Sequence, residues 1–210
     1  LKHRLITIHN LTRSFPEKPL KDIFNIAKAS YRSFAIMAAE FPELYKFRKD
    51  NLHRWVELRG LNNYTDACRA GKGALLFSAH FGNWEIGNAA LAFLSKPLIF
   101  MVRRLDSLFL EELTTYLRGK SGNLSLHKQK AMRQSLRLLE SGETINILID
   151  QNASSYEGVF VDFFGRPACA TSGLARMTLR TGATIMPAFT IRLPNGKYVL
   201  EIGPKMEIIN

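Results

Sequence analysis

The residues best suited to do chemistry are a histidine and a glutamate, His80 and Glu85, in the run 78–85. A histidine paired with a carboxylate can act as a general base, because the carboxylate sets the imidazole tautomer and stabilises the imidazolium. On one continuous helix, residues five apart point about 140° apart and do not meet. Gly82 and Asn83 supply the turn that the pair needs, since Gly adopts unusual backbone angles and Asn is a favoured helix N-cap. The alternative is a structural His80, with Glu85 complementing the helix dipole.

These two residues lie where a buried strand is expected to hand over to a helix, which is where α/β proteins build their sites. After residue 73 the pattern alternates between short apolar runs, typical of buried strands, and amphipathic helical runs. The expected strands are 74–79, 97–102, 144–149, 184–191 and 197–202, and the expected helices are 84–94, 108–117, 128–140 and 172–180. This order predicts an α/β domain with a mainly parallel central sheet flanked by helices.

The first part of the chain has a helical pattern, interrupted at Phe15-Pro16 and Phe41-Pro42. Since no linker or internal repeat separates it from the rest, we expect one domain, 1–210, made of a helical lead-in (1–70) and a catalytic α/β core (71–210). Cys68 and Cys169 are isolated, and two reduced thiols are expected.

The chain is basic, with 29 Lys and Arg against 18 Asp and Glu and a net charge of +11. Such a surplus favours an acidic partner, which leaves nucleic acid, an anionic membrane or an acidic protein open. The charge is spread along the chain, which disfavours a detachable nucleic-acid-binding arm. No run of 18 apolar residues predicts a transmembrane helix. The sequence contains no GxGxxG, no GxSxG and no zinc-ligand spacing.

The run 78–85 resembles the His-x4-acid motif of the bacterial lipid A biosynthesis acyltransferase family, which is commonly written with Phe-Gly-Asn-Trp between the two residues. Further blocks are similar in the same order, with Arg104 where the family usually has proline. They are 102–106, 149–151, 157–167, 181–187 and 200–204. The family usually has an N-terminal membrane-anchoring helix and a C-terminal extension, and we expect both to be absent from this chain.

The resemblance implies a glycerolipid acyltransferase-like fold and transfer of a fatty acyl group from a thioester to a hydroxyl, with no cofactor and no metal. His80 is expected to remove the hydroxyl proton, and Glu85 to orient His80. The implied donor is acyl carrier protein or acyl-CoA, the acceptor is a glycolipid such as a lipid A precursor, and the location is the cytoplasmic face of the inner membrane. The basic surface then suits an anionic membrane and an acidic carrier protein, with no nucleic acid as partner.

Four further residues are expected to bind substrate. Arg103 ends an expected strand, where a guanidinium can bind phosphate, although a salt bridge with Asp106 is the alternative. Arg118 matches an arginine that recurs near this place in the family, or it complements the end of its helix. Asp150 and Arg166 are candidates for binding the acceptor. The aromatic residues Phe160, Phe163 and Phe164 are expected to line an acyl groove, contact lipid or pack in the core.

Two competing functions remain open at this point. A nucleic-acid-binding domain is motivated by the net charge alone and predicts steeply salt-dependent binding. A thioesterase-like hydrolase uses the same histidine to activate water in place of an alcohol.

Overall fold

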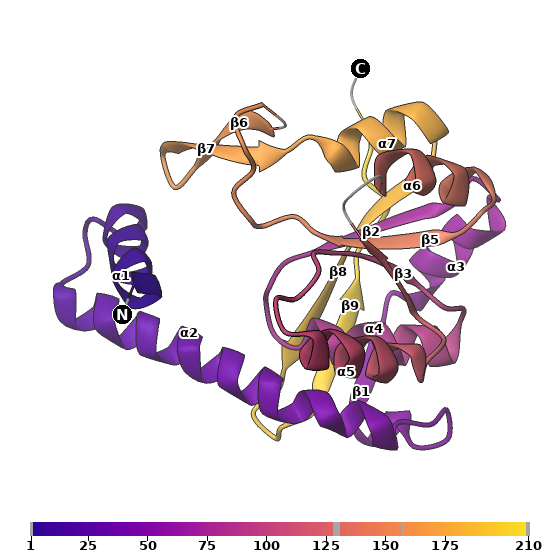
Figure 1. Cartoon of the computed structure of the whole chain (residues 1–210), viewed down its shortest axis with the longest axis horizontal. Helices are drawn as coiled ribbons and strands as arrows, with labels where there is room; N and C mark the ends of the chain where they lie inside the picture. Colours follow the sequence, from indigo (N-terminus) through magenta and orange to yellow (C-terminus); the bar gives the residue numbers. More distant parts are fainter. Residues whose placement is uncertain (1, 128–130, 157, 209–210) are drawn as a thin grey trace.

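A twisted sheet forms the centre of the computed structural model, which describes residues 2–127, 131–156 and 158–208 (Figure 1). Its strands are β1 (Val56–Arg59), β2 (Ala74–Ser78), β3 (Ile99–Val102), β4 (Leu124–His127), β5 (Thr144–Leu148), β8 (Thr184–Arg192) and β9 (Tyr198–Ile202). They follow the order β1-β9-β8-β2-β5-β3-β4. Among the described residues, β8 pairs with β9 antiparallel and the other neighbours pair parallel. The expected mainly parallel α/β architecture is therefore confirmed.

Helices cover both faces of this sheet, so its central strands are buried on both sides. The helices of the core are α3 (Leu61–Arg69), α4 (Trp84–Leu94), α5 (Leu108–Gly119), α6 (Ala131–Glu140) and α7 (Gly173–Thr181). Leu76 of β2 packs on the side of α3 and α4, whereas Leu75 packs on the side of α6 and α7. Both leucines are fully buried, which explains why β2 is a continuous apolar run and not an alternating one.

The N-terminal segment begins with two helices, α1 (Lys2–Ser14) and α2 (Leu20–Glu40), followed by the short 3-10 turns η1 (Phe41–Lys46) and η2 (Leu52–Arg54). In Figure 1, α2 runs along the lower side of the molecule and α1 stands on its outer end. The inner end of α2 is tied to the core, because Glu40 accepts hydrogen bonds from Tyr198 Oη, Asn83 Nδ2 and Arg192 Nη2. No residue of α1 is buried.

A two-stranded antiparallel hairpin, β6 (Gly158–Phe163) and β7 (Arg166–Thr171), projects away from the central sheet (Figure 1). This hairpin, β1 and β4 are not among the strands expected from the sequence. Each of β1 and β4 has four residues with no continuous apolar run, so pattern alone did not distinguish them from loops. Strand β1 also interrupts the expected helical lead-in and adds an edge to the main sheet. The expected helix 128–140 is confirmed from Ala131, while 128–130 lie outside the described residues.

Candidate active site

The turn between β2 and α4 is built as its residue types predict. Gly82 has φ of +61° and its backbone packs directly on β8, where a Cβ atom would lie 1.7 Å from the carbonyl oxygen of Thr190. Asn83 is fully buried and caps α4, with its side chain accepting a hydrogen bond from the backbone N–H of Ile86 at 3.2 Å. The expectation that Gly and Asn make this turn is therefore confirmed, and the turn sets the positions of His80 and Glu85.

His80 is held by one carboxylate, that of Asp150. Its ring Nδ1 lies 2.8 Å from Asp150 Oδ1, and its backbone N–H donates to Asp150 Oδ2 at 2.9 Å. The ring also contacts Trp84 edge-on, with the centroids 5.0 Å apart. About a third of each of the His80 and Asp150 side chains is exposed, so the pair is accessible to a substrate.

The sheet explains why these two residues meet although they are far apart in the sequence. Strands β2 and β5 are parallel neighbours, with Ser78 opposite Leu148. The pairing continues past the strand ends, since Ile149 donates its backbone N–H to the carbonyl of Ser78 at 3.0 Å. Two residues further along each chain stand His80 and Asp150. The site therefore lies at the carboxyl edge of the parallel sheet, as expected for this fold class.

The electrostatics of the pair keep Asp150 ionised, and this favours one tautomer of the His80 ring. Partial burial raises the pKa of Asp150, but hydrogen bonds from the His80 side chain and backbone, together with the attraction of His80, outweigh it, so the pKa is lowered from 3.8. The ionised carboxylate only accepts hydrogen bonds, so Nδ1 of the neutral ring must carry the proton. Nε2 then presents its lone pair, which is the arrangement that a general base requires.

Glu85 forms a second charged pair, with Arg118 on α5. Arg118 Nη2 donates to Glu85 Oε1 at 2.6 Å, Arg118 Nε donates to Oε2 at 3.0 Å, and Trp84 Nε1 donates to Oε1 at 3.1 Å. Only 6% of Glu85 is exposed. Burial lowers the pKa of Arg118, but its hydrogen bonds and attraction to Glu85 outweigh this, so the pKa is raised above its ordinary value. Bidentate pairing of this kind holds a guanidinium in one orientation.

The carboxylate bonded to the His80 ring is thus that of Asp150, and not the expected Glu85. Glu85 and His80 nevertheless line one cavity of about 460 Å³, together with Arg118. Asp150 was expected to bind acceptor, because residue types alone do not show that β5 lies next to β2. A catalytic dyad of His80 and Glu85 stays a prediction.

The same cavity carries the basic residues that follow β3. Arg103 and Arg104 line it with Arg118. Arg103 donates to Asp106 at 3.1 Å, and both side chains are largely exposed. The salt bridge considered from the sequence therefore exists, but an exposed pair of this kind is weak, so an anionic ligand can displace it.

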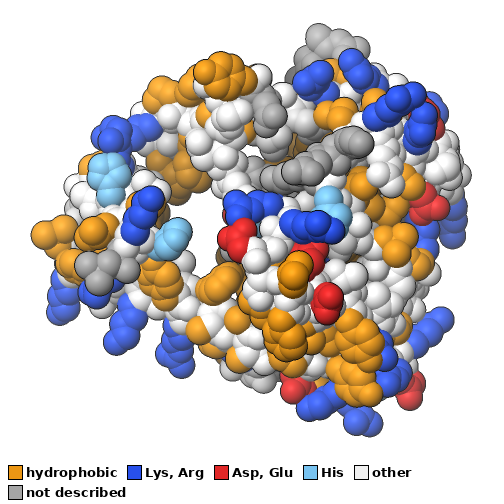
Figure 2. Space-filling view, in the orientation of Figure 1, with side chains coloured by type: hydrophobic (Ala, Val, Ile, Leu, Met, Phe, Trp, Pro, Cys, Tyr) orange, Lys and Arg blue, Asp and Glu red, His pale blue; other side chains and the backbone are white. Residues whose placement is uncertain are grey.

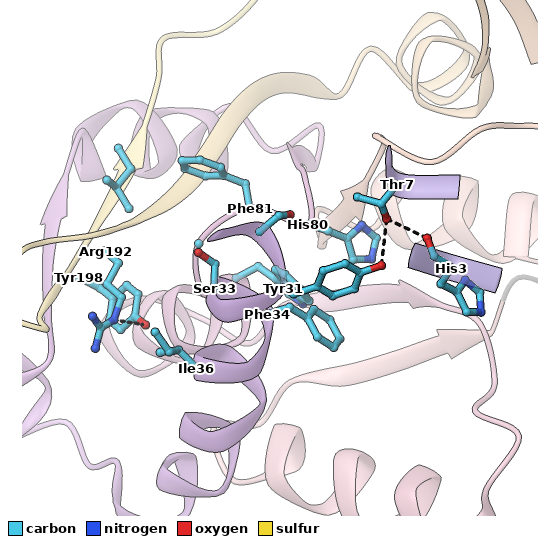
Figure 3. A pocket seen from close by; sticks show the side chains of 14 residues that line it. His3, Thr7, Tyr31, Ser33, Phe34, Ile36, His80, Phe81, Arg192 and Tyr198 are labelled. Carbon is cyan, nitrogen blue, oxygen red and sulfur yellow. Dashed lines mark hydrogen bonds between the residues drawn. The ribbon is translucent and has the colours of Figure 1, made fainter. Parts of the chain in front are cut away.

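A larger cavity, of about 740 Å³, opens on the other side of His80 (Figure 3). Figure 3 shows Tyr31 and Phe34 of α2 facing the same space as His80 and Phe81 of the turn between β2 and α4. Thr7 of α1 closes part of it and hydrogen-bonds Tyr31 Oη at 3.0 Å. The side chains here are mostly apolar or aromatic, so this cavity suits a hydrocarbon chain better than a charged group.

Arg166 lies apart from the other expected arginines, in a third cavity of about 480 Å³ beneath the hairpin. Asp150 and Gln151 line this cavity from the catalytic side, and Arg13 lines it from α1. The three cavities therefore converge on the His80–Asp150 pair. Of the aromatic residues, Phe163 lines the third cavity, while Phe160 and Phe164 are exposed.

Two further results concern metals and membrane spans. Among residues 2–127, 131–156 and 158–208, no group of three or more His, Cys, Asp or Glu side chains is arranged to hold a metal ion. Within the same residues, no helix combines the length and apolarity that crossing a membrane requires.

The similarity of this chain to known proteins runs along nearly its whole length. The sequence model of a family described as bacterial lipid A biosynthesis acyltransferase matches residues 2–210. The lipid A biosynthesis lauroyltransferase of Escherichia coli (strain K12) is 26% identical over 199 residues, which cover 94% of this chain and 64% of that protein.

Two further relatives cover less of this chain. The lipid A biosynthesis acyltransferase of Haemophilus influenzae is 27% identical over 163 residues, covering 76% of this chain and 51% of that protein. The phosphatidylinositol mannoside acyltransferase of Mycolicibacterium smegmatis is 26% identical over 181 residues, covering 85% of this chain and 60% of that protein. The chain thus spans between 51% and 64% of the length of these three relatives.

Proposed function

The chain belongs to the bacterial lipid A biosynthesis acyltransferase family, and from this premise and the site geometry we propose that it transfers a fatty acyl chain from a thioester to a hydroxyl of a glycolipid. The observation that carries the proposal is the His80–Asp150 pair, which stands where three cavities meet. A transferase with two large substrates needs separate space for the acyl chain, the donor and the acceptor beside one base.

In the proposed reaction, His80 Nε2 takes the proton of the acceptor hydroxyl as its oxygen attacks the thioester carbonyl. Asp150 holds the ring in the required tautomer and stabilises the imidazolium. Collapse of the tetrahedral intermediate breaks the carbon–sulfur bond, and the imidazolium returns the proton to the thiolate. The products are an ester and a free thiol.

Glu85 stays in the proposed catalytic unit through its pair with Arg118. The buried carboxylate keeps the guanidinium in place at the wall of the cavity that also contains His80. We assign Arg118, Arg103 and Arg104 to an anionic group of the substrates, such as a phosphate, because guanidinium groups bind phosphate with directed hydrogen bonds. Arg166 is assigned to the acceptor through the third cavity.

Two observations indicate which acceptor and which donor the chain uses. Relatives named for lipid A biosynthesis favour a lipid A precursor as acceptor, while the relative named for phosphatidylinositol mannoside widens the class to glycolipids. The net charge of +11 favours acidic acyl carrier protein over CoA as donor. These observations also favour the cytoplasmic face of the inner membrane as the place of action.

The test is an acyl-transfer assay with purified protein, acyl carrier protein thioester and a detergent-dispersed lipid A precursor, with products identified by mass spectrometry. We expect His80→Ala to lower kcat by about 10²–10⁴. Glu85→Gln should cost about 3 kcal/mol of stability because it leaves Arg118 buried without its counter-charge, and activity should fall with it. Full activity of His80→Ala contradicts the mechanism, whereas free fatty acid formed at the same rate with and without acceptor indicates a thioesterase-like hydrolase.

A further inference from the structure

Large hydrophobic side chains are exposed on the β6–β7 hairpin and on the two N-terminal helices. On the hairpin, Phe160 is 68% exposed and Phe163 is 61% exposed. On α1, Leu5 is 65% exposed. These segments together account for Leu5, Ile6, Leu20, Phe24, Tyr31, Phe34, Val159, Phe160, Val161, Phe163 and Phe164. Leaving so many apolar groups in water is unfavourable, and contiguous exposed patches mark interaction sites.

The hairpin and the helices form one continuous surface, which we name the apolar arm and define as α1, residues 15–35 and β6–β7. Phe15, between α1 and α2, packs edge-on against Phe164 at the tip of the hairpin, with centroids 5.1 Å apart. Arg13 of α1 and Val161 of the hairpin line the same cavity. In Figure 1 both parts project from the same side of the central sheet.

The charge of the apolar arm is strongly positive on its helical side. Residues 1–35 contain seven Lys or Arg and two Asp or Glu: Lys2, Arg4, Arg13, Lys18, Lys21, Lys28 and Arg32 against Glu17 and Asp22. Figure 2 shows blue basic and orange hydrophobic side chains interspersed over this part of the molecule. Basic residues mixed with Phe and Leu are typical of segments that lie in the interface of an anionic bilayer.

Strand β6 of the hairpin exposes side chains on both of its faces, which favours a bilayer over a protein partner. Successive residues of a strand point to opposite faces, so Phe160 points to one face while Val159 and Val161 point to the other. All three are exposed. A folded protein covers one face of such a hairpin, whereas the headgroup and acyl region of a membrane surrounds both.

We propose that the apolar arm inserts into the interface of an anionic phospholipid bilayer. The large cavity beside His80 is lined by His3, Thr7, Tyr31 and Phe34, so it opens next to the inserted helices. A lipid acceptor or acyl chain can then enter sideways without crossing water. This role for the cavity rests on the proposed function, while membrane binding itself does not.

The test is co-flotation of the purified chain with vesicles of phosphatidylcholine alone or with 30 mol% phosphatidylglycerol. We expect binding to the anionic vesicles, weakened by salt. Phe160→Ser and Leu5→Ser should each reduce the partition coefficient about tenfold, because each removes apolar area that the bilayer covers. Lys21→Gln and Lys28→Gln should each reduce it about fivefold on anionic vesicles and leave binding to neutral vesicles unchanged.

Matched controls lie outside the apolar arm. Leu179→Ser on α7 removes a leucine that is 60% exposed, and Arg69→Gln on α3 removes an exposed cation, and neither should change binding. His80→Ala should bind vesicles as the unaltered chain does, which separates this proposal from the proposed function. Thermal unfolding of each variant verifies folding.

Three outcomes overturn the proposal. The first is that anionic vesicle binding fails the controls. Either the chain does not bind these vesicles at all, or Leu179→Ser weakens binding as much as Phe160→Ser does. The second is a dimer, seen by sedimentation equilibrium, that Phe160→Ser dissociates, because a second copy then covers the surface. The third is binding of acyl carrier protein that depends on Phe160 and Leu5 while vesicle binding does not.

Discussion

His80 depends on a single carboxylate for its position, its orientation and its tautomer. Asp150 bonds both the backbone nitrogen and ring Nδ1, so a change at Asp150 alters the backbone of the turn as well as the base. Glu85, by contrast, is occupied by Arg118 and Trp84. At this scale the two acids of the site have different partners, since Asp150 bonds the candidate base and Glu85 bonds Arg118.

Asp150→Asn is expected to lower kcat of acyl transfer by about 10²–10⁴, because an amide can donate to Nδ1 and thereby hold the ring in the tautomer with Nε2 protonated. Single-turnover rates with a fixed donor measure the effect. Asp66→Asn on α3, where the carboxylate pairs with exposed Arg69, is the control and should leave the rate unchanged. An Asp150→Asn rate within twofold of the unaltered chain contradicts the proposed role.

The lowered pKa of Asp150 also predicts how stability depends on pH. Because the folded-state pKa lies below the ordinary 3.8, ionised Asp150 stabilises the fold fully above that pH, and the contribution is lost as pH falls through the lowered value. Urea unfolding from pH 7 to pH 3 should therefore show a difference between the unaltered chain and Asp150→Asn that shrinks on acidification. A difference that grows instead shows that the pair is not the one described.

At the scale of elements, the site depends on how the turn between β2 and α4 packs against β8. Gly82 forms an isolated bridge with Thr190, and Gly87 on the next helical turn also packs directly on this residue. The last residue of α2, Glu40, accepts a hydrogen bond from Asn83 Nδ2. The turn is thus enclosed by the sheet and the N-terminal segment, which keeps His80 at the strand end.

Gly82→Ala is expected to destabilise the chain by about 3 kcal/mol or more, since the new Cβ meets the Thr190 carbonyl oxygen at 1.7 Å and φ is +61°. Gly71→Ala is a matched control, because its φ is +73° but nothing lies within 4 Å of the added Cβ. That change should cost only the backbone strain, about 1 kcal/mol. Chemical denaturation measures both, and equal effects of the two changes would remove the packing argument.

At the scale of the whole molecule, the surplus charge of +11 has three proposed uses, of which docking of acyl carrier protein is one. The basic residues of the apolar arm attract an anionic bilayer. The arginines that line the cavity beside His80 attract anionic groups of the substrates. All three are long-range attractions between exposed charges, so all three should weaken as salt rises.

The salt dependence of the donor separates these uses. With acyl carrier protein as donor and detergent-dispersed acceptor, KM for the donor should rise about tenfold between 50 and 300 mM NaCl while kcat stays nearly constant, because steering acts on encounter. A neutral acyl-thioester of N-acetylcysteamine serves as the control and should show no such rise. An equal rise for both donors contradicts docking through charge.

Much of the fold could be predicted from the order of apolar and polar residues along the sequence. The apolar runs around Leu75 and Ile145 are continuous because these strands are buried on both faces, and the helix from Trp84 to Leu94 begins where Asn83 predicts an N-cap. The hairpin β6–β7 could not be predicted in this way, because the side chains of β6 are exposed on both faces and leave no alternation of apolar and polar residues.

The sequence by itself determined the α/β class, the turn around Gly82 and Asn83, and the choice of His80 as the candidate base, since each depends on local residue types. Only the tertiary structure decided which acid bonds the His80 ring. Strand order is set by how helices pack on the sheet and not by any one segment, and it places β5 beside β2. Asp150 therefore reaches the histidine from 70 residues away, while Glu85, five residues away, turns toward Arg118.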